Sequence, residues 1–168
     1  NCRVLVAIES PRSPDVLRLL GEHLSDMHAT SPPESVHALD PAELDHPSIT
    51  FWAARAENEG ALLGVGALKV HDDRTGEVKS MRTVSSARGQ GVAGLILAEV
   101  ISTARVLGLT ALNLETGTEP YFESARRLYE RFGFVVRGPF ADYTEDPHSI
   151  YFGLTLTTGV DPSPGNLG

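Results

Sequence analysis

A glycine-rich segment, Arg-Gly-Gln-Gly-Val-Ala-Gly at residues 88–94, is the first feature of this sequence that could do chemistry. Glycines leave backbone N–H groups accessible, and a helix N-terminus adds a partial positive charge. A mostly apolar segment with the character of a helix follows and ends at Gly108. The pattern therefore predicts a loop and a helix start that bind the phosphate oxygens of a ligand.

The same glycines also match the dinucleotide fingerprint G-x-G-x-x-G, at Gly89, Gly91 and Gly94. Glu115 follows at roughly the distance expected for the acidic residue that binds the ribose in that fingerprint. Two observations count against this interpretation. Residues 85–88 separate the first glycine from the preceding strand, and the earlier strands are joined by short turns. A dinucleotide fold needs helical crossovers between parallel strands, so we favour a different phosphate ligand.

Three titratable residues have positions that could serve acid–base chemistry. Tyr129 falls on the apolar side of a predicted helix, with Ala125, Leu128 and Phe132. A tyrosine there can pack its ring in the core and still direct its hydroxyl into a cleft. Glu77 begins one predicted strand and Glu115 ends another, where each carboxylate could face a slot or simply be solvated.

The elements that must position these residues mix helical and strand patterns. Helical patterns cover residues 13–29, 40–44, 91–107 and 123–132, and strand patterns cover 3–10, 50–56, 61–71, 77–84, 110–115, 134–138 and 149–156. The first helix has an expected core stripe of Val16, Leu17, Leu20, Leu24 and Met27. Paired prolines predict a loop after it, and Asp40 with Glu43 predicts a capping box. The three strands before the glycines form an antiparallel meander.

Two motifs in this order resemble the GNAT superfamily of N-acetyltransferases. The first is EVKSMRTVSSARGQGVA at residues 77–93, which contains R-x-x-G-x-A, and the second is ARRLYERFGF at residues 125–134. The resemblance implies an α/β (α+β) GNAT fold, a mixed central sheet of about seven strands flanked by about four helices. SPPESVHALD and PFADYTEDP also look like segments of a bacterial subgroup that acts on small molecules. We expect a single domain over residues 1–156 and a disordered tail over 157–168, which is rich in proline and glycine.

The resemblance implies direct transfer of an acetyl group from acetyl-CoA to a primary amine of a small molecule, in a ternary complex. The pyrophosphate would lie on the glycine loop, and the pantetheine arm along the strand before it. These expected contacts are Met81, Arg82, Thr83, Val84, Arg88, Gly89, Gln90, Gly91, Val92, Ala93 and Gly94. One strand N–H would face the thioester oxygen.

The family pattern also assigns catalytic roles. Tyr129 would protonate the departing thiolate, and Glu77 would act as the base through water, with Glu115 as its rival. The asparagine often found three residues before Ala125 is Phe122 here, so no polar contact to the pantetheine is expected from that position.

Acceptor contacts are expected from the loops that vary within the family. His37, Tyr143, Arg82 and Glu115 are the candidates, although loop residues also cap turns and helices. Arg82 together with Lys79 would suit a substrate carboxylate.

Composition excludes several other classes of protein. The net charge of −8 argues against binding to duplex nucleic acid, and no apolar run is long enough for a membrane span. The single cysteine and the scattered histidines predict no metal site. We expect a cytoplasmic protein, with a homodimer through the last strands possible in this family. A non-catalytic acyl-CoA sensor is the main alternative, although a pure binder would need neither Glu77 nor Tyr129.

Overall fold

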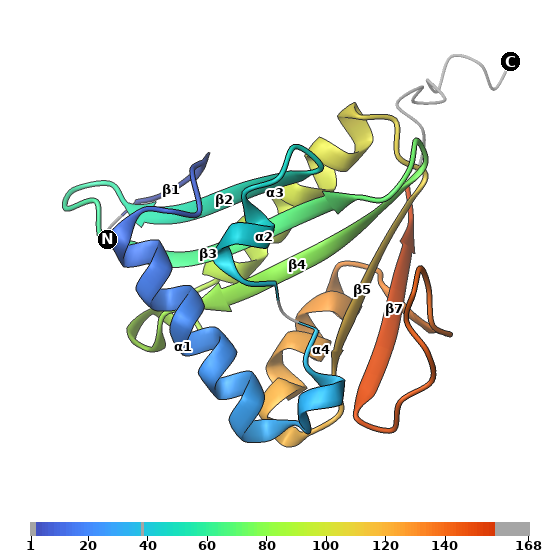
Figure 1. The fold of residues 1–168 in the computed structure, drawn as a ribbon. Helices are drawn as coiled ribbons and strands as arrows, with labels where there is room; N and C mark the ends of the chain where they lie inside the picture. Colours follow the sequence, from blue (N-terminus) through green and yellow to red (C-terminus); the bar gives the residue numbers. More distant parts are fainter. Residues whose placement is uncertain (1–2, 38, 157–168) are drawn as a thin grey trace, which may run out of the picture.

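The computed structural model describes residues 3–37 and 39–156, which form a seven-stranded mixed sheet with helices on both faces (Figure 1). The sheet order is β1-β2-β3-β4-β5-β7-β6. The strands are β1 (Val4–Ile8), β2 (Ile49–Ala56), β3 (Leu62–Val70), β4 (Thr75–Thr83), β5 (Ala111–Gly117), β6 (Val135–Arg137) and β7 (Ser149–Thr155). The expected mixed sheet is confirmed, while the tail at 157–168 lies outside the described residues.

Four α-helices cover the sheet: α1 (Pro14–Thr30), α2 (Pro41–Leu44), α3 (Val92–Val106) and α4 (Glu123–Arg131). Helices α3 and α4 contribute to one buried apolar cluster, and α1 and α2 contribute to the other. The capping box of α2 is confirmed, because Asp40 accepts from the Glu43 N–H and Glu43 accepts from the Asp40 N–H. The proline-rich loop after α1 contains one short 3-10 turn, Pro33–Ser35.

The buried stripe of α1 differs from the expected one at two positions, because Leu24 is only half-buried and Leu17 is exposed. Leu17 is 39% exposed, whereas Leu19 is only 3% exposed. Val16, Leu19, Leu20 and Met27 are the buried positions, so the face turned to the sheet is centred away from Leu17. Because both residues are leucines, their types do not tell which one is buried. The rotation of α1 against the sheet decides it.

Strands β4 and β5 pair only at one end, and this opens the sheet. Their parallel pairing covers Thr75–Glu77 with Ala111–Asn113 and then stops. Beyond Glu77, the β4 backbone keeps β3 as a partner on one side, and on the side toward β5 none of the described residues pairs with it as a strand. The result is a slot in the middle of the sheet, where a ligand could pair with the free edge of β4.

A bulge in β4 changes which side chains face the slot. The register with β3 shifts between Val65 and Ala67, and Ser80 has a positive φ of 56°. Arg82 and Lys79 are paired with Val65 and Ala67, two positions on the same face of β3. The bulge therefore places Arg82 on the α1 side together with Lys79 and Glu77.

The close approach of α3 to the sheet predicts an effect on stability. A Cβ on Gly66 would lie 2.6 Å from both Ile96 Cγ2 and Met81 Sδ, whereas one on Gly21 of α1 would have no atom within 4 Å. We expect Gly66→Ala to lower the free energy of unfolding by about 1–3 kcal/mol through overpacking. We expect Gly21→Ala to raise it by about 0.5–1 kcal/mol. Denaturant unfolding measures both changes, and a Gly66→Ala protein as stable as wild type would contradict the close contact.

Candidate active site

The glycine loop joins β4 to α3 and presents open backbone. Gly89 and Gly91 have φ values of +78° and +82°, and a Cβ on either would have no atom within 4 Å. Gly91 is also the N-cap of α3, so the first N–H groups of that helix point out of its end. This is an open cradle for phosphate oxygens, with the positive end of the α3 dipole directly behind it.

Gly94 behaves differently from the third glycine of a dinucleotide fingerprint. That glycine normally permits close packing of helix against strand. Here, a Cβ on Gly94 would meet Leu128 and Phe132 of the α4 region at 3.7–3.8 Å, an ordinary contact distance. The close contacts of α3 are made instead by glycines of β3. The packing gives no support to the dinucleotide interpretation.

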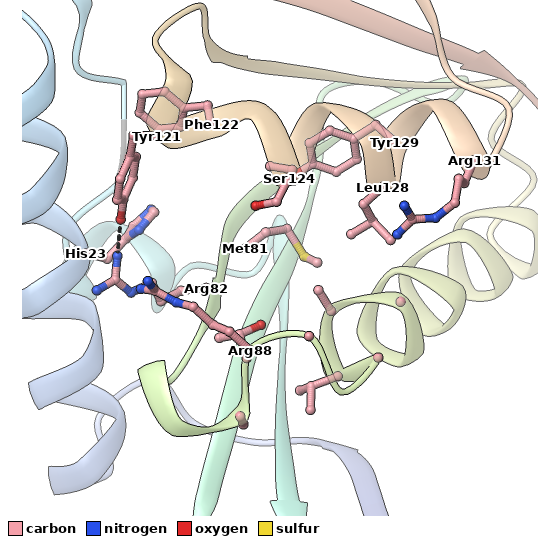
Figure 2. A pocket seen from close by; sticks show the side chains of 18 residues that line it. His23, Met81, Arg82, Arg88, Tyr121, Phe122, Ser124, Leu128, Tyr129 and Arg131 are labelled. Carbon is pink, nitrogen blue, oxygen red and sulfur yellow. Dashed lines mark hydrogen bonds between the residues drawn. The ribbon is translucent and has the colours of Figure 1, made fainter.

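A groove of about 380 Å³ leads from the glycine loop to Tyr129 (Figure 2). It is lined by nearly all the residues expected to bind acetyl-CoA: Met81, Arg82, Thr83, Arg88, Gly89, Gly91, Val92, Ala93 and Gly94. Arg131 of α4 adds a second exposed guanidinium near the loop. The open glycines, the cationic rim and the free edge of β4 fit a long ligand with phosphates at one end.

Two expected acetyl-CoA contacts are not in the groove. The Val84 N–H donates to the Leu63 carbonyl oxygen at 2.9 Å, so it cannot pair with a pantetheine arm. The Gln90 side chain lies on the loop surface, where it donates to the Ser86 carbonyl oxygen at 3.3 Å. The expectation for the Val84 N–H is corrected because β3 continues to pair beyond the end of β4.

A smaller chamber of about 90 Å³ adjoins the groove. Both cavities are bordered by the same five residues, His23, Met81, Phe122, Ala125 and Tyr129. Glu77, Lys79, His37 and Glu115 border only the chamber. The structure therefore brings both candidate bases to one side of Tyr129 and the groove to the other.

Tyr129 packs in the core as the helical spacing predicted. It is 6% exposed, and its ring lies 5.8 Å from that of Phe134 and 6.3 Å from that of Phe152. Burial, reinforced by the charge of Glu115, raises the pKa of Tyr129 above its ordinary value. The phenol therefore stays protonated across the neutral range, as an acid requires.

Glu77 is a buried carboxylate with three polar partners. It is 2% exposed. Its Oε2 accepts from the Tyr143 hydroxyl at 2.6 Å and from Lys79 Nζ at 3.2 Å. Its Oε1 lies 2.8 Å from His71 Nε2. Both oxygens are thus engaged, and the ammonium of Lys79 compensates the charge.

Glu115 has a different environment at the same chamber. Burial raises its pKa to about 7, although a hydrogen bond from Ser149 and the charge of Lys79 oppose the shift. The Ser149 hydroxyl lies 2.8 Å from Oε2. A carboxyl with this pKa exchanges protons near neutral pH, which suits a general base.

His37 and Tyr143, the expected acceptor contacts from the two loops, touch each other. Their rings meet edge to face with centroids 4.9 Å apart. Burial, followed by the charge of Lys79, lowers the pKa of His37, so the imidazole is uncharged at neutral pH. Burial, followed by the charge of Glu77, raises the pKa of Tyr143.

Arg82 lies apart from Lys79, contrary to the expectation that both bind one substrate carboxylate. Its guanidinium donates to the Tyr121 hydroxyl at 2.6 Å (Figure 2). It also donates to Asp26 Oδ2 at 2.6 Å. Lys79 is committed to Glu77, so the two cations have separate partners. The bulge at Ser80 sets them on one face but does not bring their ends together.

His23, Tyr121, Asp26 and Ser149 also lie at the site, and none of them was expected from the sequence. Burial, followed by the charge of Arg82, lowers the pKa of His23 to about 4, so this imidazole is uncharged where it borders both cavities. A signal for His23 existed, since it lies four residues before Met27 on the buried side of α1. Tyr121 and Asp26 carry no such signal, because they meet Arg82 only through the tertiary fold.

Within the described residues, no group of three or more histidine, cysteine, aspartate or glutamate side chains is arranged to hold a metal ion. A search of the same residues for a helix long and apolar enough to cross a membrane finds none.

Comparison with known proteins identifies the class of this fold and site. Residues 16–134 match the family model described as the acetyltransferase (GNAT) family. The chain is 48% identical over 146 residues to the Uncharacterized N-acetyltransferase YsnE of Bacillus subtilis, covering 87% of this chain and 95% of that protein. The protein belongs to the GNAT acetyltransferase family, and the alternative of a dinucleotide-binding fold is wrong.

Solved structures agree with this assignment. A protein of Klebsiella pneumoniae described as an acyl-CoA N-acyltransferase has a TM-score of 0.76 and 25% identity, covering 94% of this chain and all of that one (100%). A GNAT family acetyltransferase of Elizabethkingia anophelis, solved with acetyl-CoA bound, has a TM-score of 0.64 and 17% identity, covering 91% and 98%. The second likeness is one of fold alone.

Proposed function

We propose that this protein transfers the acetyl group of acetyl-CoA directly to a primary amine of a small molecule, with both substrates bound at once. The observation that carries the proposal is that the two cavities adjoin and share Tyr129 in their walls. The groove has the cradle that a phosphate-bearing donor needs, and the chamber has the carboxyl groups that an ammonium needs. The fold neighbour with acetyl-CoA bound supports the choice of donor.

Different groove residues bind different parts of acetyl-CoA. When bound, acetyl-CoA supplies an activated acetyl thioester. Gly89 and Gly91 give backbone N–H groups to the pyrophosphate, and Arg88 and Arg131 add positive charge near it. The free edge of β4 at Met81–Thr83 pairs with the amides of the pantetheine arm, and one N–H there polarises the thioester carbonyl. The phenyl ring of Phe122 offers this arm only apolar contact.

Glu115 is the general base in this proposal. An incoming amine is protonated at neutral pH and must lose a proton before it can attack. Both carboxylate oxygens of Glu77 are already occupied, one by Tyr143 and Lys79 and the other by His71, so neither is free to take a proton from the amine. Glu115 has a raised pKa and a single hydrogen bond, from Ser149. These environments favour Glu115 as the base over Glu77, the residue that the family pattern suggested.

Tyr129 is the acid that protonates the departing thiolate. It borders groove and chamber alike, which places it where the donor and the acceptor meet. The low-dielectric surroundings that raise its pKa also raise the basicity of a thiolate beside it, so proton donation remains favourable.

The part of the acceptor that carries the amine is small and narrow, because the chamber has a volume of only about 90 Å³. His37 and His23 form neutral parts of its wall. An anionic group further along the acceptor would have to lie near the groove and compete with Asp26 for Arg82. A cytoplasmic location and a homodimer remain predictions.

A screen of primary amines tests the proposal. Each amine is incubated with the protein and acetyl-CoA, free thiol is followed, and the amine is analysed by mass spectrometry. We expect thiol release that depends on one class of small amine and an acetylated product in equal amount. Binding of acetyl-CoA without acetylation of any amine, across linear, aromatic and amino-acid acceptors, would favour a non-catalytic acyl-CoA sensor.

A further inference from the structure

Glu77, Lys79 and Tyr143 form a hydrogen-bonded cluster around the buried carboxylate of Glu77, and this cluster takes no part in the proton transfers described above. We propose that this cluster is an anchor that fastens two loops to β4 and thereby sets the affinity for the acceptor amine. Glu77 is then a positioning residue. The inference rests on the proposed function, since it concerns the acceptor side of the same site.

Each loop is attached to the cluster by a hydrogen bond. The loop after α1 is held where Lys79 Nζ donates to the His37 carbonyl oxygen at 3.0 Å. The loop between β6 and β7 is held where the Tyr143 hydroxyl donates to Glu77 Oε2 at 2.6 Å. Lys79 Nζ also lies 3.0 Å from the Tyr143 hydroxyl, so a single ammonium contacts both loops.

The loops are also joined to each other. The Ser35 hydroxyl lies 2.6 Å from Asp146 Oδ2, and the rings of His37 and Tyr143 are in edge contact. Because of these links, neither loop can leave β4 without disturbing the other. They therefore behave as one wall of the chamber.

Burial makes Glu77 the part of the anchor whose removal matters most. Its side chain is 3% exposed and that of Lys79 is 9% exposed. Breaking a buried ion pair by removing one partner leaves the other charge buried without compensation, which is costly. His71, from the turn between β3 and β4, supports the other carboxylate oxygen and fixes its orientation.

The anchor affects acceptor binding through the position of His37. Its ring borders the chamber while its carbonyl oxygen and its ring are held by Lys79 and Tyr143. Loosening the anchor therefore moves the wall against which the acceptor binds. It leaves the glycine loop, the free edge of β4 and Glu115 in place.

Two conservative variants test the anchor. Tyr143→Phe removes the hydroxyl, and Glu77→Gln removes the charge. For each we expect the KM of the acceptor amine to rise about tenfold, with kcat and the Kd of acetyl-CoA unchanged and the rising limb of the pH–rate profile retained. The double variant should raise KM no further than the stronger single variant, because both changes break one unit. Glu9→Gln is the matched control, since Glu9 pairs with Arg55 outside the site and its loss should leave KM unchanged.

The opposite pattern would overturn the inference. If Glu77→Gln lowered kcat a hundredfold and abolished the rising limb of the pH profile, Glu77 would be the base. If both single variants kept the wild-type KM, the cluster would have no role in acceptor binding.

Hydrogen exchange separates failure of this inference from failure of the proposed function. It needs no substrate, so it applies even if no amine is acetylated. We expect faster exchange at residues 31–37 and 138–148 in both single variants, with unchanged exchange in α3. Unchanged exchange in the two loops would overturn the anchor whatever the enzyme's reaction.

Discussion

Replacing Tyr129 by phenylalanine is expected to lower the single-turnover rate of acetyl transfer by about 10²–10⁴-fold, the usual contribution of a general acid. The substitution removes only the hydroxyl. The ring contacts with Phe134 and Phe152 remain, so the fold and the Kd of acetyl-CoA should change little. Rapid mixing with acetyl-CoA and the best amine measures the rate.

The stability of the variant and its affinity for acetyl-CoA are the controls. If both are preserved and the single-turnover rate of the variant is no more than threefold below that of wild type, Tyr129 is a packing residue. Another group then protonates the thiolate. Because burial raises the pKa of Tyr129, we also expect no falling limb of the rate from this residue in the neutral range.

Replacing Glu115 by glutamine is the second change with a large expected effect. We expect kcat to fall by about 10²–10⁴-fold and the rising limb of the pH–rate profile, with its midpoint near pH 7, to disappear. The limb rises with pH because the base must be deprotonated. Glu77→Gln should retain this limb, and a profile in which only Glu77→Gln removes it would contradict the assignment.

Glu115→Gln should also stabilise the protein at high pH. The pKa of Glu115 in the folded protein is about 7, against an ordinary value of 4.5, so folding favours the protonated form. Below pH 4.5 the carboxyl is protonated in the folded and the unfolded protein and does not lower the free energy of unfolding. As the pH rises through 7, it progressively lowers the free energy of unfolding. Glutamine does not titrate, so we expect the variant to gain on the order of 2–3 kcal/mol relative to wild type between pH 4 and pH 9.

Denaturant unfolding at several pH values measures this gain. A difference between variant and wild type that does not depend on pH would show that the carboxyl is not destabilised by burial. Gain of stability together with loss of activity is the usual signature of a strained catalytic group.

The donor side of the site was predictable because it depends on local sequence. Positive φ at Gly89 and Gly91 needs glycine, and the N-cap of α3 follows directly from the chain order. Tyr129 was predictable from the stripe it shares with Ala125 and Leu128. These features arise within a few residues of one another, so spacing alone constrains them.

The acceptor side was less predictable because it depends on contacts between distant segments. The bulge at Ser80 has no sequence signal, yet it decides that Arg82 faces α1 and meets Asp26. Glu77 and Glu115 look alike as strand-end carboxylates. Their roles differ because Tyr143 and Lys79 engage one, while burial raises the pKa of the other.

Titration calorimetry with acetyl-CoA tests the central claim, that the groove leading from the glycine loop to Tyr129 is a site for this donor. We expect one-to-one binding of acetyl-CoA by the wild type and none of NAD. Gly91→Val should weaken the affinity at least tenfold, because a β-branched residue is strained at a φ of +82°, while Gly21→Ala should keep it. Absence of acetyl-CoA binding, or equal binding by the Gly91→Val protein, would contradict the account.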